Sequence, residues 1–290
     1  MSAPEPSQAT PTLPDAARVE RRALLATCVA AAVRGAEIVR AGAANLDQLT
    51  WDTKSPADFV SDVDRASERA IAGIIGERHP DARLVGEEFS PDGVADLSGL
   101  TFVADPLDGT TNFLHGYPWY AVSIAAVVDG NPVAGAVLNV ATGELFTATA
   151  GGGARRNGEP IAVSRETQPL RSLIGTGFPF KHAHLVEPYM ASLPTIMRGT
   201  AGVRRAGAAA LDLADVACGR FDAFWELMLA PWDIAAGVLL VREAGGLATD
   251  LQGGPARIGH GPLVAGNPAM HAWLLRQLGA GSAIGAAGGR

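Results

Sequence analysis

Apolar residues recur at helical spacing in two stretches near the start of the chain. From Asp15 to about Ala44, and again from Ala66 to Arg78, apolar side chains fall three or four residues apart. This period places them on one face of a helix, which can then pack against a core. We therefore predict two helices ahead of the first sheet. The polar segment between them, Leu46 to Asp64, is predicted to be a mobile loop.

Short apolar runs separated by turn residues dominate the middle of the chain. They lie at residues 84–85, 101–103, 121–128, 133–140, 145–150 and 160–163. The segments Asp129-Gly130-Asn131 and Ala141-Thr142-Gly143 separate three of these runs and are typical of hairpin turns. The runs are therefore predicted to be strands of an antiparallel sheet.

Helical and strand patterns alternate in the last third of the chain. Beyond the run 173–177, we predict strands near 202–206, 221–227, 247–250 and 262–265, and helices at about 184–198, 208–219, 232–244 and 268–278. Helices packed on two sheets fit this order. Residues 1–14 and 279–290 have little to bury, so we expect a disordered tail before, and a flexible tail after, a single domain over 15–278.

The composition indicates a globular protein and narrows its partners. Of the 290 residues, 48% are apolar and 18% are charged, which allows a substantial core and excludes a disordered chain. The formal net charge of −7 argues against wholesale binding to nucleic acid or to anionic membranes. No apolar run reaches the ~18 residues of a membrane span. We expect a soluble cytoplasmic protein, with Cys28 and Cys218 as buried reduced thiols.

The stretch DPLDGTTNF, residues 105–113, carries the most informative chemistry. It follows an apolar run and sets two carboxylates, Asp105 and Asp108, three residues apart. Gly109 permits close backbone approach, and the residues after it suit the start of a helix, whose N–H groups can bind phosphate. Two carboxylates beside an anion site need cations between them, and oxygen ligands without His or Cys suit Mg²⁺. Taken alone, the motif would favour an ordinary turn in which Asp105 caps the backbone.

Two further acidic motifs favour the metal interpretation. Gly86-Glu87-Glu88 follows an apolar pair, and Trp232-Asp233 opens an apolar helix. Like charges ~4 Å apart repel by ~4 kcal/mol at an effective dielectric of 20. A cluster of Glu87, Asp105, Asp108 and Asp233 would therefore need counter-ions.

With GEE, DPLDGTTNF and PWDIAAG in that order, and Lys54 to Asp64 upstream, the chain resembles the inositol monophosphatase family. Its members are Mg²⁺-dependent, lithium-sensitive phosphomonoesterases. The resemblance covers roughly Glu20 to Leu278 and is greatest to the bacterial inositol-1-monophosphatase branch, judging by residues 204–207, 210–213 and 241–246. It implies an α+β fold, the layered α-β-α-β-α sandwich of the inositol monophosphatase and sugar phosphatase type, and a homodimer.

The resemblance also implies the ligands of two or three Mg²⁺ ions. Glu87, Asp105 and the backbone carbonyl of Leu107 would hold a first ion that activates water. Asp105, Asp108 and Asp233 would hold a second near the leaving oxygen. A third, weaker ion would lie near Glu87.

The remaining roles implied by the resemblance concern water and substrate. Thr110 and Asp64 would orient the attacking water, and the N–H groups of Gly109 and Thr110 would bind the phosphate. Hydroxyl groups of the sugar would contact Asp108, Ala209, Glu226 and Asp233. Two residues have structural alternatives, because Asp64 could serve only as a helix cap and Glu226 could face water at a sheet edge. The chain has Ala208 where many relatives carry Ser or Thr. The resemblance therefore does not say which polar groups contact the substrate at this position.

The leading functional hypothesis is hydrolysis of myo-inositol 1-phosphate to inositol and phosphate. A related phosphatase acting on histidinol phosphate, fructose 1,6-bisphosphate or a nucleotide phosphate is the alternative, since the metal motifs do not separate these substrates. A further alternative is a binding role with secondary catalysis, because bacterial relatives have been linked to RNA and transcription complexes. The acidic net charge counts against direct RNA binding.

Overall fold

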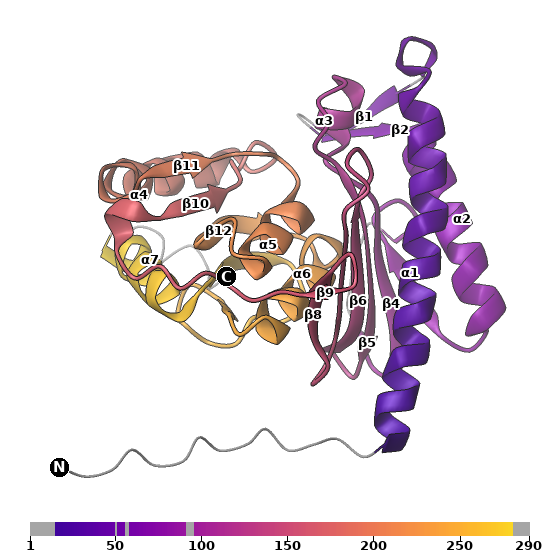
Figure 1. The fold of residues 1–290 in the computed structure, drawn as a ribbon. Coiled ribbons are helices and arrows are strands. Elements are labelled where there is room, and N and C mark those ends of the chain that lie inside the picture. The colour runs from indigo at the N-terminus through magenta and orange to yellow at the C-terminus, as the bar shows by residue number, and fades with distance from the viewer. Residues whose placement is uncertain (1–14, 50, 56–57, 91–95, 281–290) are drawn as a thin grey trace.

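The computed structural model describes residues 15–49, 51–55, 58–90 and 96–280. These residues form five layers, which follow one another from right to left in Figure 1 as helices, sheet, helices, sheet and helices. The predicted α-β-α-β-α sandwich is therefore confirmed. The tail predicted at 1–14 lies outside the described residues, and so does the part of the tail predicted at 279–290 that follows residue 280; residues 279 and 280 end the last helix instead. No described helix is long and apolar enough to span a membrane.

The first layer consists of two helices, α1 (Asp15–Ala43), which ends one residue before its predicted end, and α2 (Asp62–Arg78), which begins four residues before its predicted start. Alanines such as Ala31, Ala32 and Ala36 are fully buried and allow α1 to approach the sheet closely. Ser61 caps α2, because its hydroxyl accepts the Val63 N–H while the Asp64 carboxylate accepts the Ser61 N–H at 2.9 Å. This capping fixes the start of α2 beside the end of the large sheet.

The large sheet has seven strands in sequence order. They are β3 (Arg83–Gly86), β4 (Leu100–Asp108), β5 (Ala121–Val128), β6 (Asn131–Asn139), β7 (Leu145–Thr149), β8 (Gly153–Arg156) and β9 (Glu159–Pro160). Neighbours pair antiparallel as predicted, except that β3 runs parallel to β4. Asp129 and Gly130 have positive φ angles of 48° and 77°, which fits the predicted hairpin turn.

The prediction of a strand over 160–163 is wrong for all but its first residue. Strand β9 ends at Pro160, and the Ile161 N–H still donates to the carbonyl of Ala154 in β8, but the Val163 N–H donates to the carbonyl of Ala244 instead of to a strand neighbour. Strand β8 was not predicted, because its sequence GARR has one buried residue, Ala154, and no apolar alternation. Pairing with β7 defines β8 as a strand.

The middle layer consists of α5 (Ala209–Ala217) and α6 (Pro231–Glu243). Every residue of α5 is buried, and so are most residues of α6. Helices buried on all sides need neighbours on all sides, which their position between the two sheets provides. The hydrophobic core here joins both sheets to both helices.

The small sheet has the order β11-β10-β12-β14-β13. Its strands are β10 (Leu173–Thr176), β11 (Gly202–Arg204), β12 (Ala223–Leu229), β13 (Leu247–Thr249) and β14 (Gly261–Gly266). Short 3₁₀ turns at Pro169–Arg171 and Ala183–Leu185 lead into β10 and into α4. The outer layer, α4 (Val186–Gly199) and α7 (Pro268–Ala280), packs on this sheet around a stacked pair, Tyr189 and Trp225, with ring centroids 5.7 Å apart.

The segment predicted as a loop between α1 and α2 instead contains a hairpin. A short 3₁₀ turn, Leu46–Gln48, is followed by β1 (Trp51–Ser55) and β2 (Asp58–Ser61), which pair antiparallel. An isolated two-stranded hairpin is marginal in water, so the pattern of this segment alone gives little strand signal. Beside it lies α3 (Thr110–Leu114), at the top of Figure 1.

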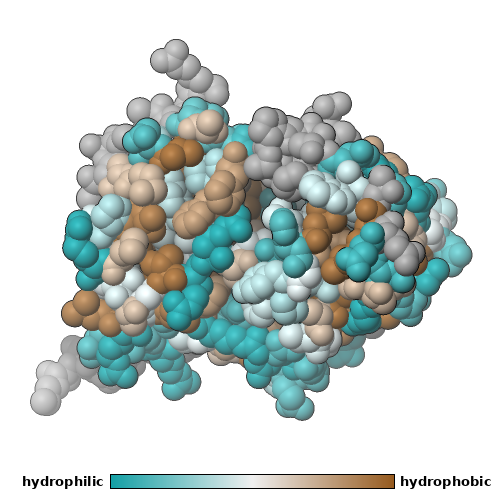
Figure 2. Space-filling view, turned by 90° about the horizontal axis from the view of Figure 1, so that it is seen from above, coloured by the Kyte–Doolittle hydropathy of each residue, from teal (hydrophilic) through white to brown (hydrophobic). Residues whose placement is uncertain are grey.

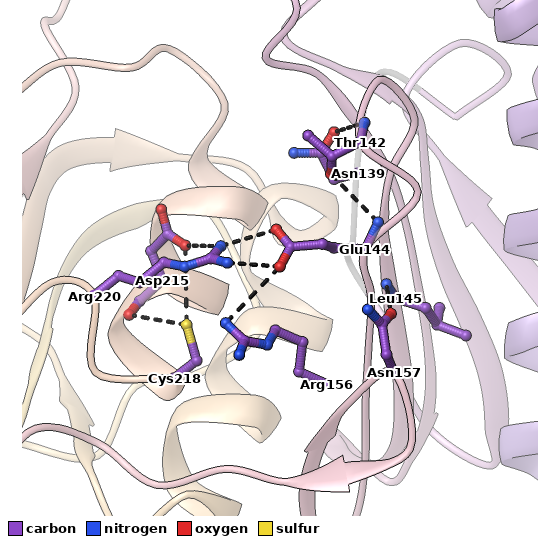
Figure 3. A network of polar contacts seen from close by, with 9 residues as sticks. All are labelled: Asn139, Thr142, Glu144, Leu145, Arg156, Asn157, Asp215, Cys218 and Arg220. Atoms are coloured by element: carbon purple, nitrogen blue, oxygen red, sulfur yellow. Dashed lines mark hydrogen bonds and ion pairs between the residues drawn. The ribbon is translucent and has the colours of Figure 1, made fainter.

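An ion-pair network ties the end of α5 to the large sheet (Figure 3). Arg220 donates to both carboxylate oxygens of Glu144, at 2.6 and 2.9 Å, and to Asp215 of α5 at 3.0 Å. Arg156 of β8 lies 3.8 Å from Glu144. Glu144 directly precedes β7, so Arg220 connects the middle layer to the sheet. The opposite end of α5 begins at the candidate site.

Candidate functional site

The side chains predicted to bind metal or substrate line one cavity of about 390 Å³. It lies at the end of the molecule that carries α3, the face shown in Figure 2, which is hollowed near its middle. The cavity brings together residues of β4, α3, α5, β12 and α6 and residues that directly follow β3 and β4: Glu87, Asp105, Leu107, Asp108, Gly109, Thr110, Ala209, Glu226 and Asp233. Asp64 does not line the cavity but is fully buried directly behind Thr110.

The end of β4 delivers the two aspartates of the central motif. The pairing of β4 with β5 is irregular between Asp105 and Asp108, which lets both carboxylates reach the cavity. Asp105 Oδ1 accepts the Leu107 N–H at 2.9 Å, and Ser67 of α2 donates to the carbonyl of Pro106 at 2.9 Å. These hydrogen bonds hold the turn in place.

Gly109 forms the corner between β4 and α3. Its φ angle is 89°, and a Cβ there would lie 3.0 Å from the backbone oxygen of Trp119. Only glycine tolerates both conditions. Asn112 supports the same corner, since its amide donates to the carbonyls of Trp119 and Ala206, at 2.7 and 2.9 Å, and so joins α3 to the segment before α5.

Thr110 and Asp64 form the pair that the motifs implied. The Thr110 hydroxyl lies 3.0 Å from Asp64 Oδ1 and 3.0 Å from the carbonyl of Leu107. Asp64 also belongs to the capping box of α2, so it both caps that helix and pairs with Thr110. Burial raises the pKa of Asp64, while hydrogen bonds from Ser61 oppose this rise.

Asp108 supports the start of α5 as well as facing the cavity. The residue before that helix, Ala208, has no capping side chain, and Asp108 accepts the Ala210 N–H at 2.8 Å in its place. Burial first, and then the charge of Asp233, raise the pKa of Asp108 to about 8. Ala208 is 1% exposed, so the departure at this position places a methyl group where a polar side chain would cap α5.

Glu87 follows β3 and is placed by a residue that the motifs did not reveal. Glu68 of α2 is buried, and its two carboxylate oxygens accept the N–H groups of Glu88 and Phe89, at 2.7 and 3.1 Å. A Cβ at Gly86 would overlap the Glu68 carboxylate, so glycine at this position provides room for it. The signal in the sequence was an acidic residue on the predicted buried face of α2.

Asp233 and Glu226 face the cavity from α6 and from β12. Asp233 accepts the Ala230 N–H at 2.7 Å and so caps its own helix. Burial and then the charge of Glu87 raise the pKa of Asp233 to about 7. Burial likewise raises the pKa of Glu226, followed by the charge of Asp233. The edge-strand alternative for Glu226 is wrong, because β12 is the central strand of its sheet.

The donor chemistry of the cavity suits a hard divalent cation. Burial and then mutual repulsion, first with Glu87, raise the pKa of Asp105 well above its usual value. The residues predicted to hold metal, Glu87, Asp105, Asp108, Asp233 and the backbone carbonyl of Leu107, offer only oxygen ligands, as Mg²⁺ prefers. In the part of the chain that the structure describes, no three His, Cys, Asp or Glu side chains are already gathered as a metal cage.

Part of the cavity lining is aromatic and basic. Phe178, Phe180, Lys181 and Arg205 form this part. The Arg205 guanidinium lies 5.0 Å from the ring centroid of Phe180 and 5.7 Å from that of Phe178. Phe178 and Phe180 lie in the loop after β10, where their side chains are 37% and 58% exposed.

Known proteins place this arrangement in a family. The family model described as "Inositol monophosphatase family" matches residues 20–282. The chain is 43% identical over 252 residues to a putative Nus factor SuhB of Neisseria meningitidis serogroup B, covering 87% of this chain and 96% of that protein. It is 42% identical to an inositol-1-monophosphatase of Rhizobium meliloti, covering 85% of this chain and 92% of that one.

A solved structure shows the same fold. The crystal structure of the extragenic suppressor protein SuhB from Bartonella henselae has a TM-score of 0.81 and 39% sequence identity, over 88% of this chain and 98% of that one. The family match, the relatives and the shared fold agree with the motifs that line the cavity. The chain belongs to the inositol monophosphatase family.

Proposed function

We propose that this protein is a Mg²⁺-dependent, lithium-sensitive phosphatase that hydrolyses myo-inositol 1-phosphate to inositol and phosphate. The observation that carries the proposal is one cavity in which four acidic side chains surround the Gly109 corner and the Thr110–Asp64 pair. The relative named inositol-1-monophosphatase, at 42% identity, supports the substrate. We further propose a single catalytic domain over 15–278, assembled as a cytoplasmic homodimer.

Each metal ligand comes from a residue whose position is described above. Glu87, Asp105 and the Leu107 carbonyl are proposed to hold one ion, and Asp105, Asp108 and Asp233 a second. A third, weaker ion is proposed near Glu87. When bound, Mg²⁺ neutralises charge on the phosphate and makes water more acidic.

The residues of the chain itself orient the reactants. Asp64 holds the Thr110 hydroxyl, which can accept a hydrogen bond from the attacking water and direct its lone pair at phosphorus. The N–H groups of Gly109 and Thr110, at the start of α3, are proposed to bind the phosphate. Asp108, Ala209, Glu226 and Asp233 are proposed to contact the hydroxyl groups of inositol.

A phosphate-release panel tests the proposal. Inositol 1-phosphate, histidinol phosphate, fructose 1,6-bisphosphate and 2′-AMP are each incubated with the enzyme and Mg²⁺. We expect the highest kcat/KM for inositol 1-phosphate, no activity in EDTA and inhibition by millimolar Li⁺. Preference for another ester would assign the alternative substrate, and full activity in EDTA would refute the metal mechanism.

The Nus factor name of several relatives supports a second candidate function, a role in a transcription complex. The net charge of −7 favours a protein partner over RNA. Co-purification of RNA polymerase with the tagged protein, and with a phosphatase-inactive Asp105→Asn variant, tests this role. Equal recovery with both proteins would support a binding function that does not need catalysis.

A further inference from the structure

Asp212 is an acidic residue of the cavity for which the proposed function has no use. It is the fourth residue of α5, lines the cavity and is only 1% exposed. Its Oδ1 atom has no hydrogen-bond partner among the described residues. Leaving a buried carboxyl oxygen without a partner is costly, so a group that enters the cavity is the natural donor to it.

Other buried carboxylates nearby differ from Asp212 in this respect. Asp215, one turn further along α5, receives a hydrogen bond from Arg220. Asp108 receives the Ala210 N–H, and Asp222 receives the Leu173 N–H at 2.7 Å. The fold therefore satisfies the acidic groups that have structural roles, and Oδ1 of Asp212 is left for something else.

The surroundings of Asp212 indicate which ligand group it would receive. Glu226 shares its wall, and the Glu226 carboxylate lies against Gly177, where a side chain would overlap it. Burial, followed by the charges of Asp108 and Glu226, raises the pKa of Asp212 well above its usual value. A substrate with a second phosphate group would be repelled by the carboxyl groups of Asp212 and Glu226. A hydroxyl group of the substrate can instead both donate a hydrogen bond to a carboxyl group and accept one from it.

We propose that Asp212 is a specificity-determining residue that binds a hydroxyl group of the substrate's leaving group beside Glu226. The substrate class is then a polyol phosphate, as opposed to an ester without neighbouring hydroxyl groups. Arg205, which also lines the cavity, partly balances the charge of this wall. The inference rests on the proposed function and adds a residue to it.

The experiment compares two esters in matched variants. Asp212→Leu keeps the branching and the number of heavy atoms of the side chain and removes the polar atoms, whereas Asp212→Asn keeps a donor and an acceptor. For Asp212→Leu we expect kcat/KM on inositol 1-phosphate to fall about 10- to 100-fold, mainly through KM, with p-nitrophenyl phosphate changed less than about threefold. Asp212→Asn should recover most of the loss. Asp215→Asn, on the same helix, should lower the melting temperature without changing the ratio of the two esters.

Several results would overturn the inference. Equal losses on both esters would make Asp212 a structural residue, and an unchanged ratio would remove it from the substrate wall. A loss confined to histidinol phosphate would indicate an ammonium site instead. If Asp212→Leu does not fold, deoxyinositol phosphates, each lacking one hydroxyl group, replace it as the probe. With the parent enzyme, the analogue that lacks the hydroxyl bound by Asp212 should have a raised KM. The Asp212→Asn variant should not raise the KM of that analogue further. A parent enzyme that releases phosphate from no ester with Mg²⁺ would refute the proposed function itself.

Discussion

Single residues in this cavity serve the fold and the chemistry at once. Asp108 supports the N-terminus of α5 while facing the proposed metal site, and Asp233 does the same for α6. Asp64 completes the capping box of α2 and holds Thr110. In Asp64, one carboxylate oxygen accepts the Ser61 N–H and the other accepts the Thr110 hydroxyl. Substitutions at these positions must therefore be judged on stability and activity separately.

Asp108→Asn separates the two roles of that residue. Asparagine keeps an oxygen that can accept the Ala210 N–H, and it resembles the neutral acid that a pKa of about 8 implies at pH 7. In EDTA we expect the variant to be at least as stable as the parent. With Mg²⁺ at ~100 times its dissociation constant, the parent gains ~2.7 kcal/mol and the variant much less. Melting curves in both conditions check this. A variant equally destabilised in EDTA and in Mg²⁺ would show that Asp108 is purely a cap.

Glu68→Gln tests whether the carboxylate behind Glu87 positions the proposed ligand. The amide keeps one acceptor but turns its NH₂ towards a backbone N–H, which should loosen the turn at Glu88 and Phe89. Losing a group that orients a metal ligand typically weakens metal binding by ~10- to 100-fold. We expect a similar rise in the Mg²⁺ concentration that gives half-maximal activity. Glu77→Gln, exposed on the same helix, is the matched control and should behave like the parent.

At the scale of elements, regular periodicity made most of the fold predictable. Strand β5 has the predicted bounds, and α1, α6 and α7 begin and end within two residues of theirs. The failures are elements that tertiary contacts define, namely the hairpin β1–β2 and the strand β8. The same limit applies to the site. Motifs identified residues adjacent in sequence, but Glu68 accepts hydrogen bonds from Glu88 and Phe89, 20 and 21 residues away, and no local pattern encodes that proximity.

The ion-pair network at the end of α5 gives a prediction about that element. Arg220→Ala leaves Asp215 buried without its cation, whereas Glu144→Gln removes a partner that is 22% exposed. Burial already raises the pKa of Asp215, against the effect of Arg220, so loss of the arginine should protonate it further. We expect Arg220→Ala to cost ~1–3 kcal/mol of unfolding free energy and Glu144→Gln ~1 kcal/mol or less. Urea denaturation measures both. Equal costs would show that the surface pair, not the buried one, carries the network.

At the scale of the whole molecule, the cavity lies where the layers meet. Asp105 and Asp108 belong to the large sheet, Asp233 to the middle helices and Glu226 to the small sheet. Ions bound to these residues would link the sheet to the middle layer, while the carboxylates repel one another in their absence. Metal binding should therefore change the stability of the entire fold, and pH should change it in a defined direction.

The direction follows from the raised pKa values. In the metal-free fold Asp108 and Asp233 titrate at about 8 and about 7, whereas an aspartate in the unfolded chain titrates near ~3.9. Between these limits the folded state holds protons that the unfolded state has released, so the unfolding free energy falls as pH rises from ~4 to ~8. Mg²⁺ needs the ionised carboxylates and displaces those protons, so its apparent affinity should rise over the same range.

Melting temperatures between pH 5 and pH 8.5 should thus fall with pH in EDTA and fall less, or rise, in excess Mg²⁺. Titration calorimetry in buffers of different ionisation enthalpy should register proton release on Mg²⁺ binding at pH 6.5. Parallel pH profiles with and without Mg²⁺, together with no proton release, would place the ions away from these aspartates.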